Sequence, residues 1–314
     1  MRSRILLCGI SAAALLAGTT ACGSSKSSGG GSGSMGEELK GASFTVSSKD
    51  FTESILLGKI TEYLLQAHGA KFTDKTDIKG SVNTRTALTS GQVDMYWEYT
   101  GTAWITYQKN TTPVSDPTDQ YDKVKAADAA NGIAWLNPAP MNDTYAFATR
   151  AGQADKLGVH TLSDLAKLSP SDATFCIESE FSTRDDGFPG MTKAYGLTAG
   201  KSQIKMLDTG VIYTETAKGG TCNFGEVFAT DGRISALKLT VLKDDKHFFP
   251  NYNAALTLKQ SLLTKYPAIA TIVDPVAAKL DDATMTELNA EVDAQGLPAD
   301  QVAKDWLKKN GFTK

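Results

Sequence analysis

The stretch SFTVSSKDFTESILLGKITEYLLQAHGAKFTDK (residues 43–75) contains the patterns of a strand, a helix and a second strand. Apolar and polar residues alternate at its start, which predicts a strand over Ser43–Ser48. Asp50 and Glu53 have the spacing of a capping box, and apolar residues then recur at helical spacing until Gly69. KFTDK follows as the second strand. This segment therefore predicts a β-α-β unit.

The alternation continues in two blocks. The first block adds a helix over residues 84–91 and a strand over 93–99, and this order predicts a largely parallel sheet covered by helices. A second block follows Asp143, and the pattern is mostly helical from Lys259 onward. We therefore expect an α/β protein with two lobes. Ligands of open α/β sheets bind outside the carboxyl ends of the strands, so the loops in SSKDFTE and WEYTGT should face a cleft between the lobes. The second block comprises predicted strands at residues 144–150, 173–179, 203–207, 222–230 and 238–244, and predicted helices at 161–168, 190–196 and 211–219.

Residues 1–22 are expected to be an export signal. Arg2 and Arg4 accompany an apolar stretch that is too short to span a bilayer. LAGTTAC, which ends at Cys22, resembles a bacterial lipoprotein signal, although Thr19 stands where an aliphatic residue is usual. Plain secretion with cleavage nearby is the alternative. A lipid on Cys22 would anchor the protein to the outer face of the cytoplasmic membrane without spanning it.

Residues 23–36 form a Ser/Gly tract, which predicts a flexible linker before a folded body of about residues 37–314. Loss of the signal leaves 30 basic residues (the total of 32 less Arg2 and Arg4) against 35 acidic ones, a formal charge of −5. An acidic body without basic blocks argues against a nucleic-acid partner.

Two cysteines remain in the folded body, Cys176 and Cys222. An exported protein meets an oxidising compartment, so a disulfide between them is plausible, and two buried free thiols are the alternative. A disulfide that closes a loop of this length stabilises a fold by roughly 4 kcal/mol in the chain-entropy model.

The sequence offers little to support catalysis. Its three histidines, His68, His160 and His247, are widely separated, and none of the common nucleophile, metal or phosphate-loop motifs occurs. The acidic pairs beginning at Asp185, Asp244 and Asp281 lie in turn-rich segments, where solvated acids or helix caps are usual. We therefore expect a protein that is not an enzyme and has no metal or cofactor.

Aromatic residues are concentrated in DMYWEYTGTAWITYQ (residues 94–108). A quaternary ammonium group has no N–H to donate, whereas aromatic faces attract it by roughly 0.5–2 kcal/mol per good contact. The run therefore suggests a site for such a cation. Core packing is the alternative, and it is favoured for Tyr96, Trp104 and Tyr107.

Four motifs follow one another along the chain, namely SSKDFTES (47–54), VDMYWEYTGTA (93–103), FATDGRI (228–234) and LKDDKHFFPNY (242–252). Together they resemble the substrate-binding lipoproteins of osmoprotectant ABC importers, which take up glycine betaine, carnitine, choline and similar solutes. The resemblance extends from about Phe44 to Gly311 and implies a two-lobed periplasmic-binding-protein fold of type II. It implies that residues 37–145 and 249–314 form lobe 1 and residues 146–248 form lobe 2. It also implies a monomer that closes on its ligand and is recognised by a membrane permease.

The resemblance also implies roles for individual residues. Tyr99 and Tyr145 match tyrosines of an aromatic box around the ammonium group, and Tyr213 is our choice for a third ring. The ligand carboxylate is expected to meet Lys49, Thr102 and Arg184.

Two positions depart from the family pattern, because Phe228 stands where some relatives have Tyr and Leu237 where many have an aromatic residue. Ordinary structural roles are the alternative for the matched residues. Lys49 would then be a solvated strand end, and Arg184 would pair with Asp185 or Asp186. A receptor of the same fold for an amino acid or another anionic solute stays open as the alternative function.

Overall fold

The computed structural model describes residues 36–314, which form two five-stranded sheets. The export signal, Cys22 and nearly all of the Ser/Gly tract lie outside the described residues. No helix within residues 36–314 is long and apolar enough to cross a membrane.

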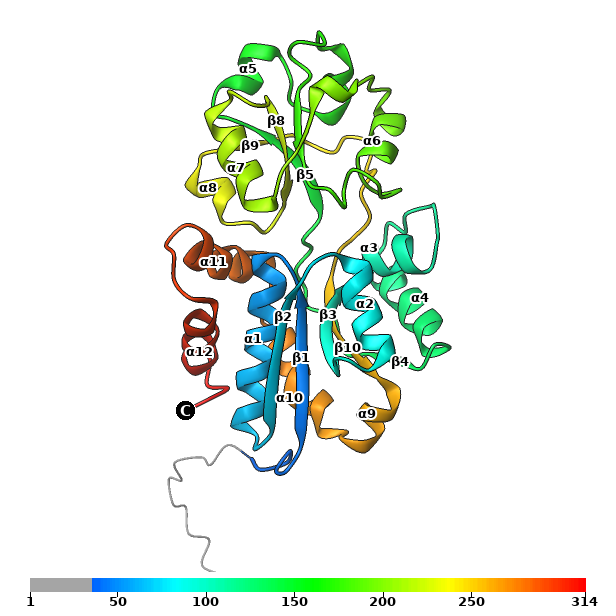
Figure 1. Cartoon of the computed structure of the whole chain (residues 1–314), viewed down its shortest axis with the longest axis vertical. Coiled ribbons are helices and arrows are strands. Elements are labelled where there is room, and N and C mark those ends of the chain that lie inside the picture. The colour runs from blue at the N-terminus through cyan, green and yellow to red at the C-terminus, as the bar shows by residue number, and fades with distance from the viewer. Residues whose placement is uncertain (1–35) are drawn as a thin grey trace, which may run out of the picture. The chain divides into compact units, whose positions relative to one another are not determined.

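The first sheet, called sheet A, has the strand order β2-β1-β3-β10-β4. Its strands β1 and β2 pair in parallel, as do β1 and β3, whereas β10 runs antiparallel to both of its neighbours. This sheet and the helices packed on it form lobe 1 (Figure 1). Its strands are β1 (Ser43–Lys49), β2 (Lys71–Ile78), β3 (Met95–Tyr99), β4 (Ile133–Trp135) and β10 (Ala254–Lys259).

Helices cover both faces of sheet A, and Leu56, Leu57 and Ile60 of α1 are buried in the main core of lobe 1. The carboxyl end of β3 continues directly into α3 and a short π-helical segment, η1. The helices of this lobe are α1 (Thr52–Ala67), α2 (Ser81–Ser90), α3 (Thr100–Thr102), η1 (Ala103–Tyr107), α4 (Pro117–Ala129), α9 (Gln260–Lys265), α10 (Ala268–Ala277), α11 (Asp282–Asp293) and α12 (Ala299–Lys309).

The second sheet, called sheet B, has the order β7-β6-β8-β5-β9 and again one reversed strand, β5. A separate apolar core built around Phe147, Phe175 and Phe224 stabilises this second lobe. Its strands are β5 (Tyr145–Thr149), β6 (Phe175–Ile177), β7 (Ile204–Met206), β8 (Phe224–Phe228) and β9 (Thr240–Val241). Its helices are α5 (Gln153–Leu157), η2 (Leu162–Lys167, a 3₁₀ helix), α6 (Phe188–Tyr195), η3 (Lys201–Gln203, a 3₁₀ helix), α7 (Thr209–Lys218) and α8 (Arg233–Ala236).

The chain crosses between the sheets twice, through residues 136–144 and 242–253. The return crossing feeds β10, whose first residue Ala254 pairs with Tyr99 at the carboxyl end of β3. In sheet B the first residue of β5, Tyr145, likewise pairs with Phe228 at the end of β8. Both crossings therefore lie at the sheet edges where the loops of the parallel strands emerge.

One expectation about local structure was wrong, and several elements were not expected. The capping box at Asp50 does not form, because Phe51 precedes α1 without a side-chain cap and Asp50 instead accepts a hydrogen bond from the Gly80 N–H at 3.0 Å. The strand β10 was not expected, since its six residues are nearly all buried and show no alternation.

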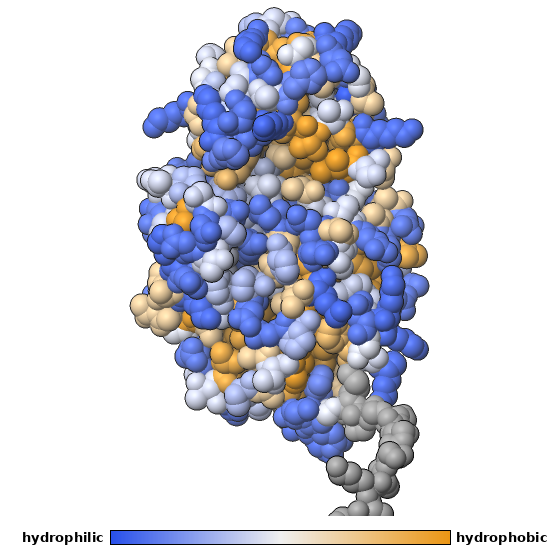
Figure 2. All heavy atoms as spheres, turned by 180° about the vertical axis from the view of Figure 1, so that it is seen from behind, coloured by the Kyte–Doolittle hydropathy of each residue, from blue (hydrophilic) through white to orange (hydrophobic). Residues whose placement is uncertain are grey.

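The structure joins Cys176 at β6 to Cys222 before β8 in a disulfide, with the Cα atoms 5.7 Å apart. The face of the described body seen in Figure 2 is mostly polar, with apolar residues grouped in a few places. The large apolar side chains that are exposed are Val82, Met206, Val211 and Val241.

Candidate ligand-binding site

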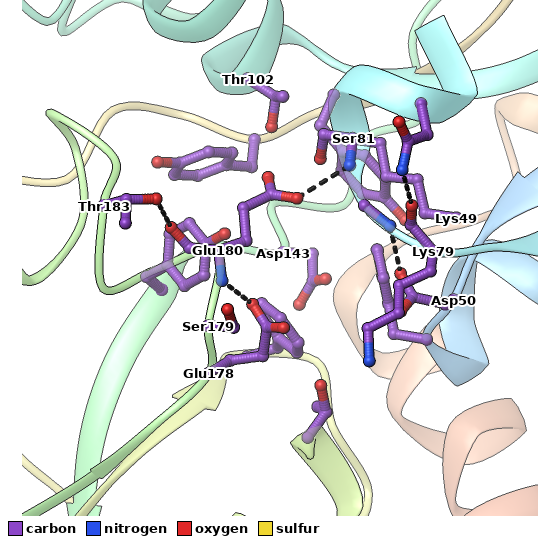
Figure 3. Close-up of a pocket in the computed structure, with 18 residues that line it drawn as sticks. Lys49, Asp50, Lys79, Ser81, Thr102, Asp143, Glu178, Ser179, Glu180 and Thr183 are labelled. Carbon is purple, nitrogen blue, oxygen red and sulfur yellow. Dashed lines mark hydrogen bonds between the residues drawn. The ribbon is translucent and has the colours of Figure 1, made fainter. Parts of the chain in front are cut away.

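A cavity of about 320 Å³ lies where loops from both lobes meet. Lobe 1 contributes the residues after β1, the residues that begin α2 and the end of β3, as the sequence predicted for SSKDFTE and WEYTGT. Lobe 2 contributes the start of β5, the loop after β6 and the end of β8. Figure 3 shows polar side chains from both lobes converging on this space.

Five aromatic side chains on the cavity wall form one connected group, which we call the ring cluster. Ring centroids lie 5.7 Å apart for Phe51 and Tyr99, and 5.2 Å apart for Phe51 and Phe228. Tyr145 lies 5.3 Å from Phe228 and 5.3 Å from Tyr252. The ring cluster therefore runs without a break from lobe 1 to lobe 2. Its members are Phe51, Tyr99, Tyr145, Phe228 and Tyr252.

The protein's own cations already approach two of these rings. The Lys49 ammonium lies 4.9 Å from the centroid of the Tyr99 ring, and the Arg184 guanidinium lies 5.6 Å from that of Tyr145. Both distances are within the range of cation–π attraction. The Tyr99 and Tyr145 rings therefore each have a cation–π contact within the protein.

Four of the six predicted ligand contacts line this cavity together, namely Lys49, Tyr99, Thr102 and Tyr145. The Lys49 ammonium donates to the buried Glu98 carboxylate at 2.6 Å. The Tyr99 hydroxyl donates to Glu53 at 3.0 Å, so its ring is fixed from behind.

The other two predicted contacts lie behind the cavity wall. Arg184 is buried and donates to both carboxylate oxygens of Asp186, at 2.8 and 2.5 Å, and to Glu180 at 2.8 Å. Tyr213 is fully buried, and its hydroxyl accepts from the Phe228 N–H at 2.9 Å. Leu237 is partly buried and packs in the same small core as Tyr213. Tyr213 therefore supports the end of β8 and does not face the cavity in this structure.

Four carboxyl groups also line the cavity, on Asp50, Asp143, Glu178 and Glu180. Burial raises the pKa of Glu178 and holds that of Asp143 well above its usual range. Burial also acts to raise the pKa of Glu180, but the nearby charges of Arg184 and Lys49 outweigh it and leave the pKa lowered. Glu180 is therefore ionised at neutral pH.

Two ring-cluster members were missed by the sequence analysis, Phe51 and Tyr252. Both stand inside quoted motifs, SSKDFTES and LKDDKHFFPNY. The signal was their place in those motifs, and Phe51 stands two residues after the selected Lys49. Within residues 36–314 no group of His, Cys, Asp or Glu side chains is arranged to hold a metal ion.

Comparison with known proteins identifies the family. Residues 42–309 match the family model described as the substrate binding domain of an ABC-type glycine betaine transport system. The chain belongs to this family. Because the family consists of extracytoplasmic substrate-binding proteins that serve ABC transporters, the expectation that the chain is not an enzyme is confirmed, and an ABC permease is its partner.

Individual relatives agree with the family assignment. A glycine-betaine-binding protein of Pseudomonas aeruginosa is 39% identical over 273 residues, covering 84% of this chain and 87% of that protein. The glycine betaine-binding protein YehZ of Escherichia coli is 36% identical over 277 residues, covering 86% and 91%. A solved structure described as a glycine betaine/carnitine/choline ABC transporter is 27% identical with a TM-score of 0.70, covering 86% of this chain and 99% of that one. These similarities confirm the two-lobed fold of type II periplasmic binding proteins.

Proposed function

We propose that the protein captures quaternary ammonium compatible solutes of the glycine betaine, carnitine and choline type and delivers them to its ABC permease. The observation that carries this proposal is the ring cluster, because it lines a cavity and draws its members from both lobes. A quaternary ammonium group has no N–H to donate, and ring faces can hold it without any hydrogen bond. Three or four such contacts supply several kcal/mol, against about 8 kcal/mol for micromolar binding.

In this proposal the two ends of the ligand contact different parts of the cavity wall. The ring cluster receives the ammonium group, while Lys49 and Thr102 face the carboxylate of ligands that have one. Arg184 lies one step further back, behind Glu180, and Tyr213 supports Phe228 from within lobe 2. Several relatives are named as binding proteins for glycine betaine or carnitine, which supports this choice of ligand class.

We further propose that residues 37–145 and 249–314 act as one lobe and residues 146–248 as the other, and that ligand favours the closed arrangement because rings of both lobes contact it. A lipid on Cys22 and the linker at residues 23–36 would hold this body, as a monomer, near the permease. Cys22 and most of that linker lie outside the described residues, so the export signal in the sequence is what supports the anchor.

Isothermal titration calorimetry of the purified protein with glycine betaine, carnitine, choline and proline tests the ligand class. We expect saturable binding of the quaternary ammonium compounds and none of proline. Tyr99→Leu keeps apolar volume but loses the ring, and we expect its Kd for glycine betaine to rise at least tenfold. Tyr99→Phe is the matched control, since it keeps the ring and loses only the hydrogen bond to Glu53. A response to proline alone would favour an amino-acid receptor of the same fold.

A further inference from the structure

Glu180, in the loop after β6, reaches across the cavity to lobe 1. One carboxylate oxygen accepts a hydrogen bond from the Ser81 N–H at 2.8 Å, in the first turn of α2. The other oxygen accepts from Arg184 at 2.8 Å. The side chain is only 25% exposed, and Figure 3 shows it directed at Ser81 across the space that the ligand would share. Glu180 therefore occupies two donors, the Ser81 N–H and the Arg184 guanidinium, that could otherwise bind a ligand carboxylate.

The other cationic and N–H groups at this wall are also engaged. The Gly80 N–H donates to Asp50, and the Lys49 ammonium donates to Glu98. Lys79 lines the cavity too, but its side chain is 75% exposed and its nearest carboxylate, on Asp208, lies 3.8 Å away. The Lys49 ammonium and the N–H groups of Gly80 and Ser81 thus already hold carboxylates of the protein at hydrogen-bond distance, whereas Lys79 does not.

The geometry points to Glu180 as an internal carboxylate that occupies the anion-binding part of the site, and we propose that it sets the choice between zwitterionic and cationic quaternary ammonium ligands. This inference rests on the proposed function. A betaine carboxylate has to displace Glu180 or lie beside it, and two like charges at contact distance repel strongly in a partly buried site. Choline has no carboxylate, so its binding leaves Glu180 in place, and its positive charge is attracted by the same group.

Because Arg184 and Lys49 keep the pKa of Glu180 low, this charge persists throughout the neutral range. Glu178, two residues earlier in the same loop, provides a comparison. It also lines the cavity, but its carboxylate accepts from the Glu180 N–H at 2.7 Å and not from a group of α2. The two residues therefore differ in whether they occupy the donors of lobe 1.

The test compares choline and glycine betaine by isothermal titration calorimetry on the wild-type protein and on Glu180→Gln. Glutamine keeps the size of the side chain and an oxygen for the Ser81 N–H, but removes the charge. We expect the ratio of the choline Kd to the glycine betaine Kd to rise about tenfold, mainly through tighter betaine binding. Glu178→Gln is the control and should change the ratio less than threefold. Glu180→Asp, which keeps the charge on a shorter side chain, replaces Glu180→Gln if that variant does not fold, and should raise the ratio by a smaller factor.

An unchanged ratio in Glu180→Gln, or a ratio that falls, overturns the assignment of Glu180. An equal rise in Glu178→Gln also overturns it, because the effect would then come from the overall charge of the cavity. Failure of the wild-type protein to bind either compound is a different result, since it removes the proposed function on which the inference rests.

Discussion

At the scale of single residues, the Lys59–Glu62 pair on α1 makes stability depend on pH. The Glu62 side chain is fully buried, and neither carboxylate oxygen has a hydrogen-bond partner among the described residues. The Lys59 ammonium lies 3.3 Å away. Burial raises the pKa of Glu62 from its ordinary value of 4.5 to about 7, although the Lys59 charge opposes the change. The folded protein therefore holds a proton that the unfolded chain releases between these two pH values.

Glu62→Gln removes this linkage. Because the folded-state pKa is raised, the stability contributed by protonated Glu62 is complete below pH 4.5 and is lost as the pH rises through about 7. We expect the difference in free energy of unfolding, variant minus wild type, to be about 2 kcal/mol larger at pH 8 than at pH 5. Urea denaturation at both pH values measures it. Glu287→Gln is the control, since the Glu287 side chain is 66% exposed. Equal pH dependence in the wild type and Glu62→Gln would contradict the argument.

The candidate site could be predicted in part from single residues. Lys49, Tyr99, Thr102 and Tyr145 were selected from motifs and do line one cavity. The sequence could not predict which side chains reach the cavity and which lie behind them. Glu180 stands between the cavity and Arg184, and such layering depends on how two lobes meet, which local sequence does not encode.

At the scale of elements, the Cys176–Cys222 disulfide crosslinks β6 to the segment that enters β8, which are neighbours in sheet B. The sequence separation of 46 residues corresponds to about 4 kcal/mol of chain entropy. We expect the double substitution Cys176→Ala with Cys222→Ala to lower the free energy of unfolding by about 2–4 kcal/mol. Urea denaturation with and without reductant measures it, and reductant should affect only the wild type. Equal stability of the oxidised and reduced wild type would show that the crosslink does not constrain the unfolded chain.

Elements were predicted well where their pattern was periodic and poorly where it was not. Strand β1 and helix α1 lie where the alternation and the helical spacing predicted them. Strand β10 lies between β3 and β4 and is buried on both faces, so its residues Ala254–Lys259 lack the alternation of a half-exposed strand. Its position inside sheet A follows from the return of the chain from lobe 2, which is a property of the topology.

At the scale of the whole molecule, a buried polar network joins the lobes behind the ring cluster. The Thr230 hydroxyl, beyond β8, lies 2.5 Å from a Glu53 oxygen and 2.6 Å from an Asp143 oxygen. One hydroxyl hydrogen can serve only one of these oxygens, and a proton on one of the two carboxyl groups would supply the second hydrogen bond. Burial raises the pKa of both, which agrees with this count. Asn289 of α11 completes the network by donating to Glu53 at 3.1 Å and to the Thr230 carbonyl at 3.0 Å.

Thr230→Val removes the hydroxyl from this network but keeps the shape of the side chain. The two carboxyl groups then lose a shared partner, which costs the observed arrangement of the lobes about 1–3 kcal/mol. Rings of both lobes line the cavity in this arrangement, and Thr230 itself is not among the lining residues, so the cost should appear as weaker ligand binding. We expect the Kd for a ligand that wild type binds to rise roughly 5- to 150-fold by isothermal titration calorimetry. Thr230→Ser keeps the hydroxyl and should bind nearly as tightly as wild type. A Thr230→Val protein with wild-type affinity would mean that the ligand selects a different arrangement of the lobes from the one described.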